Sequence, residues 1–145
     1  MSNSSFIKLV KASATSQVTL QDVKSKLQHY IDMTTKTGKQ LDWGYSEAAF
    51  PYSIAEKPEG KDQWFYLKGK DQKLYKYIVF GVGSETVPNE EGNEEQYFIQ
   101  VVLPEGATHG DKGKANEFCK YLAKEYKAEL HLFNGRIMYY YPRKP

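Results

Sequence analysis

The stretch over residues 64–83, which reads WFYLKGKDQKLYKYIVFGVG, constrains the fold more than any other part of the chain. It predicts two strands joined by a polar turn at residues 69–73. The second strand, residues 74–82, is apolar or aromatic on both faces. One face carries Leu74, Ile78, Phe80 and Val82, and the other carries Tyr75, Tyr77 and Val79. Such a strand is typical of the middle of a sheet rather than of its edge.

Length and composition set broad limits on the class of protein. The chain has 145 residues, enough for one domain that buries a core without disulfides or metals. Its net charge of +2 and pI near 8.5 do not require a polyanionic partner. The single Cys119 excludes an intramolecular disulfide, and neither a signal-peptide pattern nor an apolar run of membrane-span length is evident. These features predict a cytoplasmic protein that does not enter a membrane.

The first helix is predicted from its start signals. Thr19 is the expected N-cap, with Asp22 three residues later, and Val18 and Val23 occupy the positions of a hydrophobic staple. An apolar face follows at helical spacing. Gly38 is expected to end the helix as a left-handed C-cap.

A second helix is predicted after the glycine-containing link at residues 104–113. Its apolar stripe has helical spacing. The stripe comprises Ala115, Phe118, Cys119, Leu122, Ala123 and Tyr126. We expect Cys119 to point toward the core, where a thiol is a small and unreactive packing residue.

The remaining segments predict further strands and exposed connections. Residues 51–57 are expected to form an edge strand after a loop whose aromatic side chains, Trp43 and Phe50 among them, pack on the core. Residues 84–95 contain five glutamates and no basic residue, which is typical of an exposed, solvated turn. Another strand is predicted over residues 97–103.

The last segment carries an Asn-Gly pair at residues 134–135 between two short apolar runs. This pair is typical of a hairpin with a two-residue type I′ turn. Such a turn would pair Leu132 with Ile137. It would likewise pair Leu130 with Tyr139, and we expect the face with these four side chains to be buried.

These segments together predict an α+β fold. One domain over residues 1–145 would contain a mainly antiparallel sheet of about six or seven strands. Two amphipathic helices would pack on one face of that sheet.

The glycine- and lysine-containing segment before the second helix is a candidate anion-binding site. The candidate residues are Gly110, Lys112, Gly113 and Lys114. Free amides at a helix N-terminus beside lysines favour a phosphate or carboxylate. Neither nucleotide-binding fingerprint is present, however, and Asp111 would repel a phosphate backbone. An ordinary helix start, capped by Thr108 or Asp111, is the alternative.

Tyrosine is unusually abundant, with twelve in the chain. It favours strands and the boundary between core and water. If helices cover only one sheet face, tyrosines on the other face would form a platform for stacking bases or docking an apolar peptide. Tyr75, Tyr77 and Tyr139 are the candidate interaction surface. The RNP signature of RNA-recognition motifs is absent. The competing interpretation is that these tyrosines only occupy the boundary between the core and water and bind no partner.

The sequence predicts no catalytic, metal or cofactor site. Cys119 falls mid-helix, and His29, His109 and His131 lie in three separate segments without ligand spacing. The glutamates of residues 84–95 lack the alternating pattern of a calcium-binding loop. We therefore favour a protein that is not an enzyme and holds no cofactor.

Three segments carry a resemblance to a known family: QLDW at residues 40–43, AAFPY at residues 48–52, and residues 60–69 with WFYL at their centre. With these segments the chain resembles a family of small uncharacterised proteins from Bacillus-type bacteria, and the likeness covers nearly its whole length. The resemblance implies a stand-alone cytosolic protein of unknown function. It supplies no catalytic residues.

Our leading functional hypothesis is a non-enzymatic binding or protein-interaction module that uses a tyrosine-rich sheet surface. Its partner would be a protein or small molecule that the sequence does not identify. The alternative is weak binding of nucleic acid or a phosphorylated ligand through the segment before the second helix. We expect a monomer or a homodimer, because an edge strand is able to pair across a two-fold axis.

Overall fold

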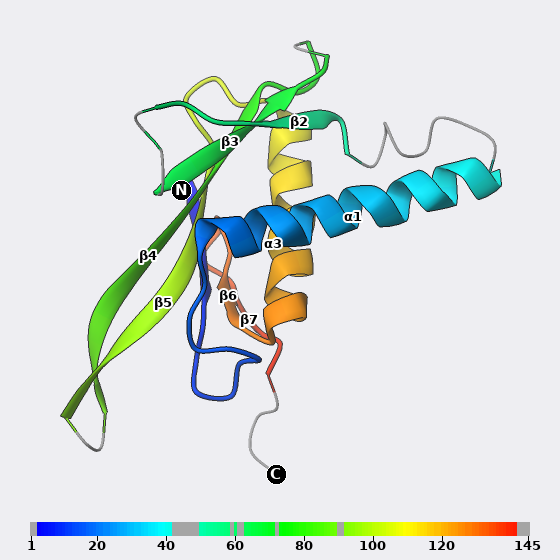
Figure 1. Ribbon diagram of the computed structural model, residues 1–145. Coiled ribbons are helices and arrows are strands. Elements are labelled where there is room, and N and C mark those ends of the chain that lie inside the picture. The colour runs from blue at the N-terminus through cyan, green and yellow to red at the C-terminus, as the bar shows by residue number, and fades with distance from the viewer. Residues whose placement is uncertain are drawn as a thin grey trace.

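The computed structural model describes residues 3–41, 50–58, 60, 63–71, 73–89 and 92–141. These residues form two helices and seven strands (Figure 1). The helices are α1 (Leu20–Leu41) and α3 (His109–Tyr126). The strands are β1 (Ser4–Lys8), β2 (Tyr52–Ala55), β3 (Trp64–Gly69), β4 (Tyr77–Asn89), β5 (Gly92–Val102), β6 (Glu129–His131) and β7 (Ile137–Tyr139).

All seven strands belong to one sheet with the order β2-β3-β4-β5-β1-β6-β7, and every neighbouring pair is antiparallel. Strand β4 lies between β3 and β5, as its two apolar faces predict. Its residue Gly81 is opposite Trp64 on one side and Gln100 on the other. The short strand β2 lies at one edge of the sheet, also as predicted.

The connection between β3 and β4 is longer than the sequence predicts. The Asp71 carbonyl accepts hydrogen bonds from the amides of Leu74 and Tyr75, at 3.1 and 2.8 Å, and these bonds close a turn. Strand β4 therefore begins at Tyr77 rather than at residue 74. As a result Leu74, predicted on the buried side of the strand, is 59% exposed.

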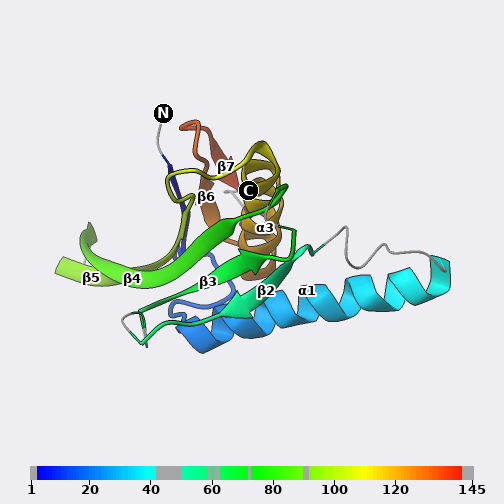
Figure 2. The same cartoon turned by 90° about the horizontal axis from the view of Figure 1, so that it is seen from above.

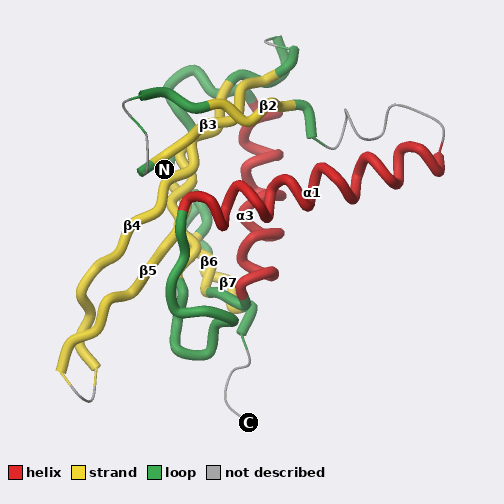
Figure 3. Tube along the Cα trace, in the orientation of Figure 1, coloured by secondary structure: helices red, strands yellow, loops and turns green. Residues whose placement is uncertain are grey.

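Both helices lie on the same face of the sheet, which confirms the predicted α+β architecture (Figures 1, 2 and 3). The sheet contributes fully buried side chains to the core, including Ile7, Phe80 and Ile99. The six residues of the predicted α3 stripe are all buried against them. Where α1 crosses α3, the Tyr30 and Phe118 rings lie 5.5 Å apart.

The start of α1 matches its sequence signals, but its end does not. Thr19 and Asp22 form a capping box, with each backbone amide bonded to the other residue's side chain at 2.9 and 3.1 Å. The staple residues Val18 and Val23 are buried. The helix then continues past Gly38 to Leu41, so the predicted C-cap is wrong. A glycine inside a helix costs only about 1 kcal/mol relative to alanine, which is too little to end it alone. The prediction for Trp43 lies outside the described residues, whereas Phe50 is buried as expected.

Residues 84–88 and 92–95 are largely exposed as predicted, but they form strands rather than a turn, because β4 extends to Asn89 and β5 begins at Gly92. Pairing of β4 with β3 ends at Gly81, and pairing of β5 with β1 ends at Phe98. Beyond those points each strand has one more backbone hydrogen bond to a neighbouring segment, between the Val82 amide and the Gln63 carbonyl and between the Leu9 amide and the Tyr97 carbonyl. The residues farther out pair with each other. We call this ribbon, residues 83–89 and 92–97, the acidic arm. It projects past the sheet on the side away from the helices (Figure 1).

Hydrogen bonds within the acidic arm explain why its charge is compatible with strand pairing. The Glu95 carboxylate accepts hydrogen bonds from the hydroxyls of Thr86 and Ser84, at 2.6 and 2.9 Å. These bonds hold the pKa of Glu95 below its usual value. The glutamate side chains of the arm are in water, so a two-stranded ribbon leaves them solvated as fully as a turn would.

The C-terminal hairpin forms, but its register differs by one residue from the prediction. Leu130 is opposite Met138, not Tyr139. Gly135 has a φ of 87°, whereas Asn134 does not have the positive φ that a type I′ turn requires. A three-residue loop, 133–135, therefore replaces the two-residue turn. A one-residue shift turns each side chain to the opposite face, so Tyr139 is 43% exposed instead of buried.

Candidate functional site

The sheet face opposite α1 and α3 is covered by no helix of the described chain (Figure 2). This face carries a group of aromatic side chains. Trp64 and Tyr66 come from β3, and Tyr77 comes from the start of β4. Their rings form a continuous series, with centroids 6.5 Å apart for Trp64 and Tyr66 and 5.8 Å apart for Tyr66 and Tyr77. They lie on this face because side chains alternate along a strand, and the intervening Phe65 and Ile78 are fully buried.

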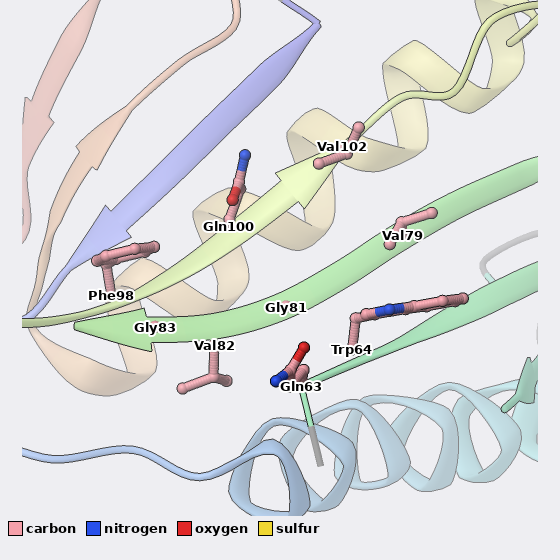
Figure 4. Close-up of a pocket in the computed structure, with 9 residues that line it drawn as sticks. All are labelled: Gln63, Trp64, Val79, Gly81, Val82, Gly83, Phe98, Gln100 and Val102. Atoms are coloured by element: carbon pink, nitrogen blue, oxygen red, sulfur yellow. The ribbon is translucent and has the colours of Figure 1, made fainter. Parts of the chain in front are cut away.

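A hollow of about 420 Å³ lies beside Trp64 (Figure 4). Gly81 is at its centre, with Trp64 on the strand to one side and Gln100 and Phe98 on the strand to the other. The Gln100 side-chain nitrogen donates to the Ser4 hydroxyl at 3.2 Å, which orients the amide. The hollow therefore combines an aromatic wall with one oriented amide group.

Glycines on β4 create the space. A Cβ at Gly81 would lie 3.3 Å from the Gln63 carbonyl oxygen and 3.7 Å from the Trp64 Cβ, so a larger side chain would occupy the hollow with little displacement. At Gly83 a Cβ would come within 2.8 Å of the Phe98 ring, which lies over that glycine. The missing side chain at Gly81 opens the sheet surface between β3 and β5, and the one at Gly83 lets the Phe98 ring lie close to β4 at the end of the hollow.

A second hollow, of about 240 Å³, shares Trp64 and Val79 with the first and extends to Tyr77 and Pro104. We call the two hollows together the aromatic groove. Lys57 lies at its edge with its Nζ 5.6 Å from the Tyr66 ring centroid. Among the described residues that line the groove, Lys57 is the only charged one. The groove is suited to apolar and aromatic groups.

The structure divides the three tyrosines that the sequence suggested as one surface. Tyr77 lines the aromatic groove and is 38% exposed. Tyr75 lies on the helix side, with its ring 5.4 Å from that of Tyr52. Tyr139 is on the uncovered face, but β7 is four strands from β4, about 19 Å across the sheet. Trp64 and Tyr66 complete the site instead, and the alternation in WFYL is the signal that finds them.

The proposed anion-binding residues do not form a loop. Helix α3 begins at His109, so residues 110–113 are its first turn. Gly110 packs closely against Tyr75 and the Leu74 carbonyl, where a Cβ would clash. Lys114 forms an ion pair with Glu117 at 3.3 Å.

Thr108 and Asp111 cap α3, which confirms the alternative interpretation of this segment. The Asp111 amide donates to the Thr108 hydroxyl at 3.0 Å, and the Thr108 amide donates to the Asp111 carboxylate at 3.0 Å. An anion at Gly113 or Lys112 would lie near this carboxylate, which disfavours it electrostatically. Binding of nucleic acid or a phosphorylated ligand at this segment stays a prediction.

Asp111 also joins α3 to the sheet, a role that its sequence position does not reveal. Its carboxylate is fully buried and accepts a hydrogen bond from the Tyr52 hydroxyl at 2.6 Å. Both of its oxygens lie 3.0 Å from the Lys76 amide. Burial, followed by the hydrogen bond to Asp111, raises the pKa of Tyr52 well above its usual value. These partners satisfy the carboxylate, so we interpret Asp111 as a structural residue.

Cys119 is fully buried on α3, and burial raises the pKa of its thiol to about 12. Only the thiolate reacts with disulfide reagents. We expect native protein at pH 8 to react with Ellman's reagent at least about 1000-fold more slowly than unfolded protein, because exposure requires opening of the core. Stopped-flow absorbance with and without denaturant measures both rates. Rapid reaction of the native protein would contradict a buried, unreactive thiol.

Two further features of the described residues bear on the class of protein. Within those ranges, no three His, Cys, Asp or Glu side chains are grouped so as to hold a metal ion. Neither of the helices there combines the length and the apolar composition that crossing a membrane requires.

Fold and site together define an α+β domain in which one antiparallel sheet carries helices on one face and an aromatic groove on the other. The family model described as Domain of unknown function (DUF1885) matches residues 3–142, so the chain belongs to this family. The sequence of this chain is 43% identical to that of a protein of unknown function from Bacillus stearothermophilus, whose crystal structure is known. The match covers 90% of this chain and 94% of that chain, with a TM-score of 0.50. No curated protein sequence is similar. The predicted resemblance to uncharacterised Bacillus-type proteins is confirmed.

Proposed function

We propose that this protein is a non-enzymatic interaction module of the cytoplasm, which binds a partner at the aromatic groove. The observation that carries the proposal is the continuous series of Trp64, Tyr66 and Tyr77 beside a hollow centred on Gly81. Aromatic side chains on an open sheet face leave apolar surface in water, and a bound partner would remove that surface from water.

The chemistry of the groove supports recognition rather than catalysis. Tryptophan and tyrosine dominate the residues that contribute most to binding energy at protein interfaces. The described lining residues include no carboxylate, histidine or cysteine, the groups that usually serve as acid, base or nucleophile. Gln63 and Gln100 supply amide groups able to hydrogen-bond a partner's backbone.

Hydroxyl-radical footprinting of a trace amount of the protein, too dilute to associate with itself, in buffer and in its own cytosolic extract tests this proposal. We expect Trp64, Tyr66 and Tyr77 to be oxidised at least about threefold more slowly in extract than in buffer, because a partner shields most of a contacted side chain. Leu74, which is exposed outside the groove, is the internal control and should be oxidised at the same rate in both.

A variant that fills the hollow sharpens the test. Gly81→Val places a side chain where the partner would insert, with little displacement of neighbouring atoms. Oxidation of the three aromatic residues should then return to the rate in buffer, while circular dichroism reports an unchanged fold. Equal rates in extract and buffer for the wild type would overturn the proposal.

A further inference from the structure

We propose that the partner at the aromatic groove is a second copy of this chain, packed face to face about a two-fold axis. This inference rests on the proposed function and names its partner. It depends on the side chains that β4 presents to the uncovered face. In order these are Tyr77, Val79, Gly81, Gly83, Glu85 and Val87, and the part from Tyr77 to Glu85, which we call the row, has Gly81 at its centre. The two ends of the row differ in charge, and its centre is the hollow.

Opposite charges lie at equal distances from the centre of the row. Lys68 on β3 is directly opposite Tyr77 and exposed. At the other end the same face carries Glu85 and Glu94 of the acidic arm together with Lys8 of β1. Lys8 forms an ion pair with Glu85 at 3.8 Å while both side chains stay partly exposed, so this end keeps a net negative charge. Gly81 is four residues from both Tyr77 and Glu85, about 13 Å along the strand in each direction. If a second copy faces the first and is turned end for end, the lysine end of each copy therefore lies over the glutamate end of the other.

These charges select one orientation of the axis. If the axis runs across the strands at the level of Gly81, the two copies of β4 are antiparallel. Each Glu85 then comes over the Tyr77 and Lys68 end of the other copy. An axis parallel to the strands would instead place Glu85 at the level of the same residue in the other copy. Opposite charges attract and like charges repel, so the axis across the strands is favoured.

The centre of this arrangement is neutral and largely apolar. Residues at the level of Gly81 meet their own counterparts across the axis, and on the flanking strands these are the uncharged Trp64 and Gln100. The two Trp64 indoles would lie against each other beside the hollows. Phe98 of one copy would lie over Val102 of the other, because these residues are equidistant from Gln100 on β5. An apolar centre with a charged rim is the usual composition of a protein interface.

The shape of the sheet is compatible with this packing. The acidic arm extends beyond the strands on either side of it and away from the helices, so no described helix stands between it and a facing copy (Figure 1). Facing sheets pack about 10 Å apart. Lysine and glutamate side chains are long enough to meet across that gap. Each arm would therefore reach the lysine-bearing end of the other sheet.

Sedimentation equilibrium and native mass spectrometry of the full chain test the proposal. At low salt we expect a species of twice the 16.7 kDa monomer mass, with a fraction that rises with protein concentration. The fraction should fall as salt is added, because salt screens the exposed rim charges. A wild-type protein that stays monomeric at low salt up to millimolar concentration would overturn the inference.

A charge exchange identifies the interface. Glu85→Lys and Lys68→Glu should each raise the dimer dissociation constant about 10- to 100-fold, because two like-charge contacts replace two attractive ones. An equimolar mixture of the two variants should form heterodimers nearly as tight as the wild type, since all the contacts are again of opposite sign. Lys120→Glu makes the same charge change as Lys68→Glu on the exposed surface of α3 and should leave the constant unaltered. Lys8→Ala removes the ion pair with Glu85 inside each copy and should not raise the constant. A mixture that stays monomeric would overturn the proposed interface.

Footprinting in an extract from a strain that lacks the gene separates this inference from the proposed function. If the partner is a second copy, trace amounts of protein should lose protection of Trp64 in that extract and keep it in the wild-type extract. Protection that persists, together with a monomeric purified protein, would reject the dimer but retain the interaction module. No protection in either extract would reject both.

Discussion

Asp111→Ala is expected to lower the free energy of unfolding by about 3–5 kcal/mol, because it removes a buried carboxylate that holds several donors. The Tyr52 hydroxyl at 2.6 Å and the amides of Lys76 and Thr108 at 3.0 Å would all lose their acceptor. A buried donor left without a partner costs about 1–3 kcal/mol. For a chain of this size the midpoint of thermal unfolding should fall by about 10 °C. Urea unfolding followed by circular dichroism measures the change.

The capping box of α1 provides a matched control for Asp111. Asp22 makes the same pair of bonds with Thr19, but it is exposed and caps only its own helix. Asp22→Ala should therefore cost only about 1 kcal/mol. Asp111→Asn, which keeps the shape and one acceptor oxygen, should fall between the two alanine variants. If Asp111→Ala costs no more than Asp22→Ala, the buried network does not stabilise the fold as argued.

Phe118→Ala is expected to cost about 3–5 kcal/mol, because it leaves a cavity where α1, α3 and β2 meet. Phe118 is fully buried, and its ring centroid lies 5.2 Å from that of Phe50 and 5.5 Å from that of Tyr30. The Tyr52 ring is 6.1 Å away. One side chain thus fills the junction of three elements that are distant in sequence. Guanidinium unfolding monitored by tryptophan fluorescence measures the loss.

Two substitutions test whether the loss reflects this cavity. Phe118→Leu keeps most of the buried volume and should cost no more than about 1.5 kcal/mol. Phe6→Ala removes the same ring from the uncovered face, where the phenylalanine is only half-buried against Phe98, and should cost about 1–2 kcal/mol. A loss at Phe118 no larger than that at Phe6 would argue against a junction packed by this ring.

The two helix starts and the buried stripe of α3 could be predicted because their signals lie within one or two turns of chain. Thr19 with Asp22 forms a local capping box, and so does Thr108 with Asp111. The central position of β4 could also be predicted, since a strand that is apolar on both sides is disfavoured at an edge. The hydrogen bonds that Asp111 accepts from Tyr52 and Lys76 could not be predicted, because both donors are distant from it in sequence.

The candidate site was predicted only in part. The sequence indicated an uncovered sheet face with tyrosines, and the structure has one. It did not reveal that Tyr75 turns toward α3 or that Tyr139 lies four strands from Tyr77. Neither outcome follows from spacing along the chain, because both depend on where the turn after β3 closes and on which strands become neighbours.

The error at the C-terminal hairpin has a similar origin. An Asn-Gly pair favours a two-residue turn in isolation. In the fold, β6 pairs with β1, where Leu130 is opposite Ile7 in the core. Met138 then packs against the core on the side of the helices, and Tyr139 faces the uncovered side. Packing of the buried side chains sets the register, and the turn adopts the three-residue form that this register allows.

Local sequence therefore determined the elements that depend on neighbouring residues: the capped helix starts, the apolar stripes and the alternating strands. Only the tertiary structure decided the length of the acidic arm, the register of the last hairpin and the joining of Trp64, Tyr66 and Tyr77 around a hollow at Gly81. The physical reason is the distance along the chain over which each kind of interaction acts. Capping bonds and side-chain periodicity act within a few residues, whereas the face and register of a strand are set by hydrophobic contacts with segments up to a whole chain length away.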